Sequence, residues 1–454
     1  MIGGEIEQMA KIMNMSEPKG LSRLDANAIA QCVENARRVT FSLVDDLTDE
    51  QLELPYLPTV NPIRWELGHV GFFYDCFLLA ELDGVPTVFE DGNNLFNSFE
   101  VDHADRWSFD ALTRSGVLDY LGQIKQQVLD RLAGHEPDAR ELYHYQLAVH
   151  HESMHAEAFT WTRQTMGYAA PSLGIRVDAA GTGDRDLAVI GDARIEGGTF
   201  SLGARRGQGF VFDNEKWEHP VEVAPFSISK TAVTNAEFLD FVDAGGYRAR
   251  ELWSSPGWVW REKAAAEHPL YWKCEDGAWS ERFFDGWGPL RERAPVVHVG
   301  WYEAEAYCTW ARRRLPSEAE WECAASTAPN VPGKRLFPWG DNLDSLAANL
   351  GFNSCGAVDV DAYPQGDSGW GCRQMLGNVW EWTASAFYPY PGFVVDTPYR
   401  EYSAPWFGYP KVLKGGAWAT SPNLVTNTHR NFFEPNRRDV FAGFRTCARD
   451  EAVR

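Results

Sequence analysis

The sequence predicts two domains, one all-helical and one of mixed α+β structure. Its 454 residues exceed the roughly 250–300 residues at which one hydrophobic core usually stops growing. Residues 25–166 keep a helical period of apolar positions with few internal glycines. Later apolar runs are short, rich in tryptophan and separated by Gly, Pro, Asn and Asp. We therefore predict a multidomain α and α+β fold, with a helical bundle at 22–184 and an irregular α+β domain at 185–450.

The first domain is expected to contain four long amphipathic helices. Their apolar residues recur every three or four positions, which is typical of helices that bury one face. The segment Gly167–Asp186 loses this period and is rich in Gly, Ala, Pro and Asp, so it suits a linker. The four predicted helices are Ala26–Leu47, Trp65–Leu82, Val117–Leu132 and Glu141–Met166.

The second domain is predicted to consist of short strands with two helices. Asn235–Val242 and Trp301–Arg313 keep a helical period, and Pro316 prevents the second helix from continuing. We find no tandem repeat and no low-complexity tract, which argues against a solenoid or a disordered tail.

Composition excludes several classes of function. A net charge of -22 and a pI near 4.9 would repel phosphate backbones, so we expect no nucleic-acid partner. No apolar run is long enough to span a bilayer, so we expect no membrane association. Residues 1–20 lack the basic start and apolar stretch of a signal peptide, which predicts a cytoplasmic protein. The eight cysteines are scattered without a CxxC pair and are expected to be free thiols in a monomer or homodimer.

The strongest chemical signal is a pair of histidines in the last predicted helix of the bundle. His151 and His155 are four positions apart, so both imidazoles lie on one helix face and can reach one metal ion. A third ligand must come from another helix, and His69 lies on one. The pattern therefore predicts a metal site of three histidines.

The spacing leaves the rival ligands and the identity of the metal open. His144 lies on a similar helix face and could compete as a ligand, whereas Glu157 lies roughly 200° round the helix from His155 and is expected to have a supporting role. Imidazole ligands suit both catalytic zinc and ferrous iron.

These residues carry a resemblance that spans nearly the whole chain. The WELGH segment ending at His69, followed by HxxxHxE from His151, resembles the DinB-like bundle of ergothioneine-type sulfoxide synthases. The second domain resembles the formylglycine-generating-enzyme fold, a C-type-lectin-like α+β domain. It does so in four motifs, which are GGTFSLG at 197–203, RLPSEAEWE at 314–322, GNVWEWT at 377–383 and GFR at 443–445.

The resemblance implies a function and a cofactor. It implies iron(II) held by His69, His151 and His155, with O2 as co-substrate. The small-molecule substrates would be hercynine (N-alpha-trimethylhistidine) and a thiol or selenium donor, joined at C2 of the imidazole. A selenosugar donor would make the enzyme a selenoneine synthase.

The resemblance also assigns residues to the substrates. A matching asparagine holds the betaine and a matching arginine holds a donor carboxylate, roles that fall to Asn431 and Arg437. A tyrosine near the iron donates a proton or hydrogen atom, for which Tyr388 is favoured over Tyr390. Further substrate contacts are expected from three residues: Met154, Trp418 and Arg438.

Two departures from the family pattern concern the donor. Met154 replaces a glutamine found in some members, and Phe433 replaces an aspartate two positions after the asparagine. A site without an acidic contact discriminates less well for an amino-acid donor. Cysteine, γ-glutamylcysteine and a selenosugar therefore all remain possible donors.

Two other classes of function stay open. One is a zinc-dependent thiol transferase that uses the same histidines, and the other is a non-catalytic lectin-like binding protein. A formylglycine-generating enzyme is disfavoured because it uses a C-terminal cysteine pair, where this chain has only Cys447.

Overall fold

The protein divides into two compact units. The computed structural model describes residues 24–108, 112–173 and 189–449. One unit, here called the helical unit, comprises Ser22–Leu173 and a later segment, Val394–Pro405. The other, here called the mixed unit, contains the described residues of Gly174–Phe393 and Trp406–Arg454. The sequence-based boundary at residue 185 thus misses that Val394–Pro405 belongs with the helices.

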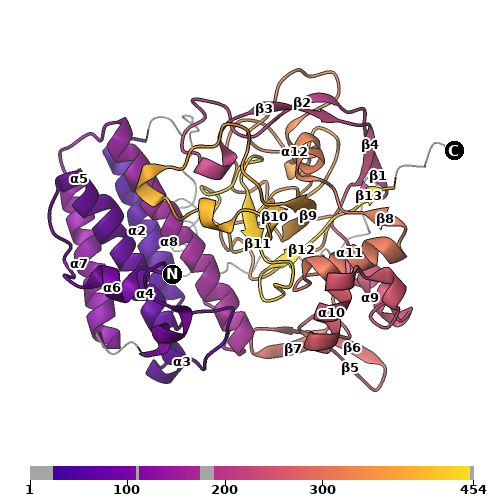
Figure 1. The fold of residues 1–454 in the computed structure, drawn as a ribbon, viewed down its shortest axis with the longest axis horizontal. Coiled ribbons are helices and arrows are strands. Elements are labelled where there is room, and N and C mark those ends of the chain that lie inside the picture. The colour runs from indigo at the N-terminus through magenta and orange to yellow at the C-terminus, as the bar shows by residue number, and fades with distance from the viewer. Residues whose placement is uncertain (1–23, 109–111, 174–188, 450–454) are drawn as a thin grey trace, which may run out of the picture. The chain divides into compact units, whose positions relative to one another are not determined.

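The helical unit is built around four long helices, coloured indigo to magenta in Figure 1. Helix α4 packs against α7 and α8, and α2 packs against the same two helices. Short helices connect them. The helices of this unit are α2 (Ala26–Ser42), α3 (Asp49–Glu53), α4 (Ile63–Tyr74), a π-helix (Asp75–Ala80), α5 (Glu81–Asp83), α6 (Gly92–Phe96), α7 (Arg114–Leu132) and α8 (Ala139–Met166), with 3₁₀ turns at His103–Ser108 and Thr397–Tyr399.

Local sequence signals explain where the longest helix begins and ends. Asp138 caps the start of α8, and the side chain of Glu141 bonds back to the Asp138 amide to complete a capping box. Gly167 ends the helix in a left-handed conformation at φ 66°. All four predicted long helices are present. Of the predicted linker, the part from residue 174 lies outside the described residues.

The second predicted helix differs from the prediction because it changes type. Residues up to Tyr74 are α-helical, and Asp75–Ala80 then form a π-helix. The Asp75 carboxylate accepts hydrogen bonds from the amides of Val88 and Phe89 and from the hydroxyl of Tyr120. These bonds attach the end of α4 to the following loop and to α7.

The mixed unit contains four small sheets rather than one large one. Their strands are β1 (Asp192–Ile195), β4 (Phe226–Ser229), β13 (Cys447–Ala448) and β8 (Arg313–Arg314); β11 (Asn431–Phe433), β10 (Lys411–Lys414), β9 (Trp380–Ala386) and β12 (Ala442–Gly443); β2 (Gly198–Leu202) and β3 (His219–Val223); and β5 (Trp272–Glu275), β6 (Ala278–Phe283) and β7 (Gly286–Pro289). All neighbours pair antiparallel except β12 with β9.

Four helices accompany these sheets, of which the sequence predicted two. They are α9 (Asn235–Asp243), α10 (Ser255–Ala264), α11 (Trp301–Trp310) and α12 (Glu318–Ser326). Helix α11 ends before the predicted Arg313, because Arg312 takes a left-handed conformation at φ 56° and Arg313 enters β8. The mixed α+β architecture is as predicted.

Buried tryptophans and buried ion pairs organise the mixed unit. The Trp321 indole N–H donates to Glu381, whose carboxylate also receives the guanidinium of Arg445 at 2.6 and 2.7 Å. These groups come from RLPSEAEWE, GNVWEWT and GFR, so the motifs serve the core of this unit. Within the described residues, no helix is long and apolar enough to cross a membrane.

Candidate metal centre

His69 is positioned by a close approach between α4 and α6. Gly68 allows this approach, since a Cβ at that position would lie 2.0 Å from the ring of Phe96. The Phe96 carbonyl oxygen lies 2.7 Å from Nδ1 of His69. Because a carbonyl only accepts, Nδ1 carries the proton and Nε2 keeps its lone pair. His69 is 6% exposed.

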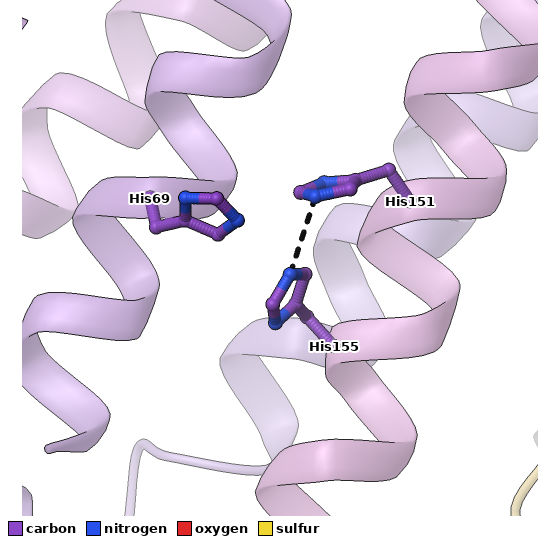
Figure 2. A group of neighbouring side chains, drawn as sticks. All are labelled: His69, His151 and His155. Carbon is purple, nitrogen blue, oxygen red and sulfur yellow. Dashed lines mark hydrogen bonds between the residues drawn. The ribbon is translucent and has the colours of Figure 1, made fainter. Parts of the chain in front are cut away.

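His151 and His155 project from one face of α8 toward His69, as Figure 2 shows. Their Nε2 atoms lie 3.3 Å apart. The His69 ring centroid is 5.0 Å from that of His151 and 4.8 Å from that of His155. One ligand atom from each histidine lies within 4.8 Å of the others. The structure therefore brings together the three histidines that the sequence singled out.

The three rings are held by different neighbours. His155 Nδ1 lies 2.5 Å from a carboxylate oxygen of Glu66, which is on α4. His151 stacks on the ring of Phe73, with centroids 3.6 Å apart and planes 12° apart. Its Nδ1 has no hydrogen-bond partner among the described residues.

Burial keeps two of these imidazoles neutral. Burial, together with repulsion from the nearby His155, lowers the pKa of His69 to about 3. Burial also holds the pKa of His151 well below its usual value, with added repulsion from His155 and His69. Neutral imidazole is the form that binds metal ions.

The donor set fits a divalent transition metal. Imidazole nitrogens suit zinc and iron alike, and three protein ligands leave further coordination positions for substrates. Among the described residues, this is the one group of three His, Cys, Asp or Glu that could hold a metal. The rival His144 instead places its Nδ1 2.7 Å from the Phe77 carbonyl oxygen. Glu157 is buried and also lies outside the group.

Replacing Gly68 with alanine should weaken metal binding through His69. The new Cβ would displace the Phe96 ring and with it the carbonyl that holds His69 Nδ1, at a cost of about 1–3 kcal/mol in unfolding free energy. Gly122→Ala on α7 is the matched control, because nothing lies within 4 Å of its added Cβ. Denaturation and metal titration of both variants test this, and equal metal affinity in the two would contradict it.

A late segment of the chain completes the surroundings of the histidines. Val394–Pro405 belongs to the helical unit, and the Tyr143 hydroxyl donates to Asp396 of this segment at 2.6 Å. The Tyr399 ring meets those of Phe73 and His151 edge-on, at 5.0 and 5.8 Å between centroids. Sequence reasoning missed Tyr399, since no local period connects it to helices that lie far earlier in the chain.

Tyr402 lies beside Tyr399 and contacts the residue that precedes His155. Its ring centroid is 5.6 Å from that of Tyr399. Its hydroxyl lies 3.9 Å from the sulfur of Met154, the residue preceding His155. The predicted contact residue Met154 thus contacts Tyr402, and neither Tyr399 nor Tyr402 was predicted.

Comparison with known proteins accounts for both units. Residues 33–159 match the DinB superfamily, and residues 184–450 match the sulfatase-modifying factor enzyme 1-like domain. The chain is 36% identical over 427 residues to "Hercynine oxygenase" of Mycolicibacterium smegmatis, covering 90% of this chain and 96% of that protein. The chain belongs to the hercynine oxygenase family. The DinB-like and formylglycine-generating-enzyme-like resemblances are thereby confirmed.

Two further relatives show how the likeness is distributed. "Hercynine oxygenase" of Mycobacterium tuberculosis is 35% identical over 90% of this chain and 96% of its own length. "Formylglycine-generating enzyme" of Streptomyces coelicolor is 32% identical over 63% of this chain and 97% of its own length. The hercynine oxygenase relatives thus share a larger part of this chain.

In this member of the hercynine oxygenase family, the two predicted catalytic tyrosines belong to the mixed unit. Tyr388 is 59% exposed. Tyr390 is buried, and its hydroxyl donates to Glu318 at 2.8 Å beneath the guanidinium of Arg430. These contacts give Tyr390 a structural role and leave Tyr388 on the surface of the unit.

The predicted substrate residues of the 429–438 segment are engaged with near neighbours. Asn431 begins β11, and its side-chain oxygen accepts from the Phe432 amide at 2.8 Å. Arg437 makes two 2.7 Å bonds to Asp439 and lies over the ring of Phe433. Phe433 therefore covers the arginine where the family pattern has an acid.

Arg438 and Trp418 are held inside the mixed unit. Arg438 donates to both carboxylate oxygens of Glu303 at 2.9 Å. Trp418 is 1% exposed and packs against the rings of Phe352 and Phe441. The predicted substrate contact of Trp418 conflicts with this burial, because the indole fills the core and presents almost no surface.

Proposed function

We propose that this chain is an iron(II)- and O2-dependent oxidoreductase that joins a sulfur or selenium donor to C2 of the imidazole of hercynine. The observation that carries the proposal is the convergence of His69, His151 and His155 in a chain of the hercynine oxygenase family. When bound, iron(II) would supply redox chemistry with O2 and would lower the pKa of a thiol or selenol. The residues around it hold and orient the substrates.

In this proposal, a tyrosine of the Val394–Pro405 segment donates the proton that O2 takes up when it is reduced. Burial raises the pKa of the Tyr399 hydroxyl, with a smaller contribution from Glu401, so the phenol keeps its proton at neutral pH. Its ring borders His151, within the same unit. Tyr399 thus takes the role first considered for Tyr388 and Tyr390, and Tyr402 is the alternative.

Replacing Tyr399 with phenylalanine should lower turnover by about 10²–10⁴-fold, the usual contribution of a general acid. The metal affinity should not change, because the hydroxyl is not a ligand. Tyr402→Phe is compared with it, since this variant removes the hydroxyl of the alternative donor, which lies 3.9 Å from the sulfur of Met154. A larger loss in Tyr402→Phe would assign the proton to Tyr402, and full activity in both variants would exclude both tyrosines of this segment.

The residues of the mixed unit that are expected to contact the substrates bear on which donor is used. Asn431 would bind the betaine, and Arg437 would bind a donor carboxylate by exchanging its contact with Asp439. Phe433 offers no acid to a donor amino group. Such a site selects less strongly for an amino-acid donor, so a selenosugar stands as a candidate beside cysteine and γ-glutamylcysteine.

The proposed function is tested by anaerobic loading of the full chain with iron(II), followed by O2 and hercynine. Separate samples receive cysteine, γ-glutamylcysteine or a selenosugar, and mass spectrometry identifies the adduct. An adduct with one donor identifies both the donor and the reaction class. Bound metal without O2 consumption, for every donor, would instead favour the zinc-dependent thiol transferase.

A further inference from the structure

Helix α4 carries a buried carboxylate three positions before its histidine. Glu66 and His69 lie on the same face of the helix, because residues three apart are neighbours on a helix surface. Glu66 is 1% exposed. The same helix therefore presents to α8 both a candidate ligand and an acidic side chain.

The carboxylate contacts the histidine of the other helix. A Glu66 oxygen lies 2.5 Å from Nδ1 of His155, whose side chain is 18% exposed. A carboxylate accepts hydrogen bonds, so the ring proton sits on Nδ1 and the lone pair on Nε2. That Nε2 is the atom that lies 3.3 Å from Nε2 of His151. Glu66 thus selects the tautomer whose free nitrogen faces the other histidines.

The two other rings have neutral neighbours, and Nδ1 of His151 has no hydrogen-bond partner among the described residues. His69 Nδ1 meets the backbone carbonyl of Phe96, and His151 stacks on the hydrocarbon ring of Phe73. Among the contacts described for the three rings, the one with Glu66 brings a negative charge. A hydrogen bond to a carboxylate raises the basicity of an imidazole ligand more than one to a carbonyl does.

We propose that Glu66 is a positioning residue of the metal centre: it fixes His155 with Nε2 toward the ion and makes this imidazole the strongest electron donor of the three. The inference rests on the proposed metal site and adds a residue to it. An electron-rich ligand favours the higher oxidation state of the metal, so Glu66 lowers the Fe(III)/Fe(II) potential.

Two substitutions separate orientation from charge. Glu66→Ala removes the hydrogen bond and the charge together, and we expect metal affinity to fall by about 10–100-fold. Glu66→Gln keeps an oxygen that accepts from Nδ1 but removes the charge, so its Fe(II) affinity should fall less than that of Glu66→Ala. Its Fe(III) affinity should fall about tenfold more than its Fe(II) affinity, a rise of about 59 mV for a one-electron couple.

The control is Glu53→Gln, which removes another carboxylate that contacts α4, through Arg64. The full chain and each variant are titrated anaerobically with Co(II) and Fe(II), the iron potential is measured, and thermal unfolding verifies the fold. Unchanged affinity and potential in both Glu66 variants would overturn the role of Glu66. Failure of the unsubstituted chain to bind either metal would overturn the metal site itself.

Discussion

His151→Ala should abolish metal binding and turnover together. His151 is 1% exposed, and its Nε2 lies 3.3 Å from that of His155. Its loss leaves two imidazoles on different helices, those of His69 and His155. Two such ligands hold a divalent ion far less tightly than three that converge. Metal content after anaerobic loading and product formation measure the two effects on the same sample.

His135→Ala provides the control for this experiment. His135 is half-exposed and contacts Glu141 at 2.8 Å, outside the metal centre. The variant should therefore bind metal and turn over as the unsubstituted chain does. Normal metal content in His151→Ala would show that the ion is held elsewhere.

The second large effect, a loss of stability, is expected from the buried ion pair that joins α2 to α8. Arg37 of α2 and Glu152 of α8 are 1% and 0% exposed, and the Arg37 Nε donates to Glu152 at 2.8 Å. Thr40 donates to the same oxygen at 2.8 Å. Arg37→Ala leaves the carboxylate buried without its charge partner, so the unfolding free energy of the helical unit should fall by about 3–5 kcal/mol.

Denaturant titration followed by circular dichroism measures this loss, with Arg140→Ala as the control. Arg140 and Glu81 form an ion pair whose side chains are 60% and 52% exposed, and such pairs contribute about 0–1 kcal/mol. The double substitution Arg37→Met with Glu152→Leu should recover much of the loss, because neither charge is then left unpaired. Equal midpoints for Arg37→Ala and Arg140→Ala would contradict the role given to the pair.

Local rules account for the part of the fold that the sequence predicted. The bundle helices follow from their apolar period, and the pairing of His151 with His155 follows from one helical turn. Helix α12 was not predicted, although Ser317 and Glu320 form a capping box, which is a local signal of a helix start. Its short length and its fully buried tryptophan concealed the helical period.

Contacts between distant segments account for what the sequence could not predict. The approach of Phe96 to Gly68 and the contact of Glu66 with His155 depend on how α4 packs, and no spacing along the chain encodes them. The position of Tyr399 depends on a segment that leaves one unit and joins the other. A tryptophan side chain can fill a core or contact a substrate, so the sequence did not distinguish the two roles for Trp418, which is buried.

The Val394–Pro405 segment limits how this architecture can be taken apart or recombined. A fragment that stops at Leu173 keeps all three histidines but lacks Tyr399 and Tyr402, although both belong to the same compact unit. A gene fusion that exchanged everything after Leu173 for the corresponding part of another protein would replace those tyrosines as well. A chimera that keeps the surroundings of the histidines must therefore carry Val394–Pro405 along with the helices of the same unit.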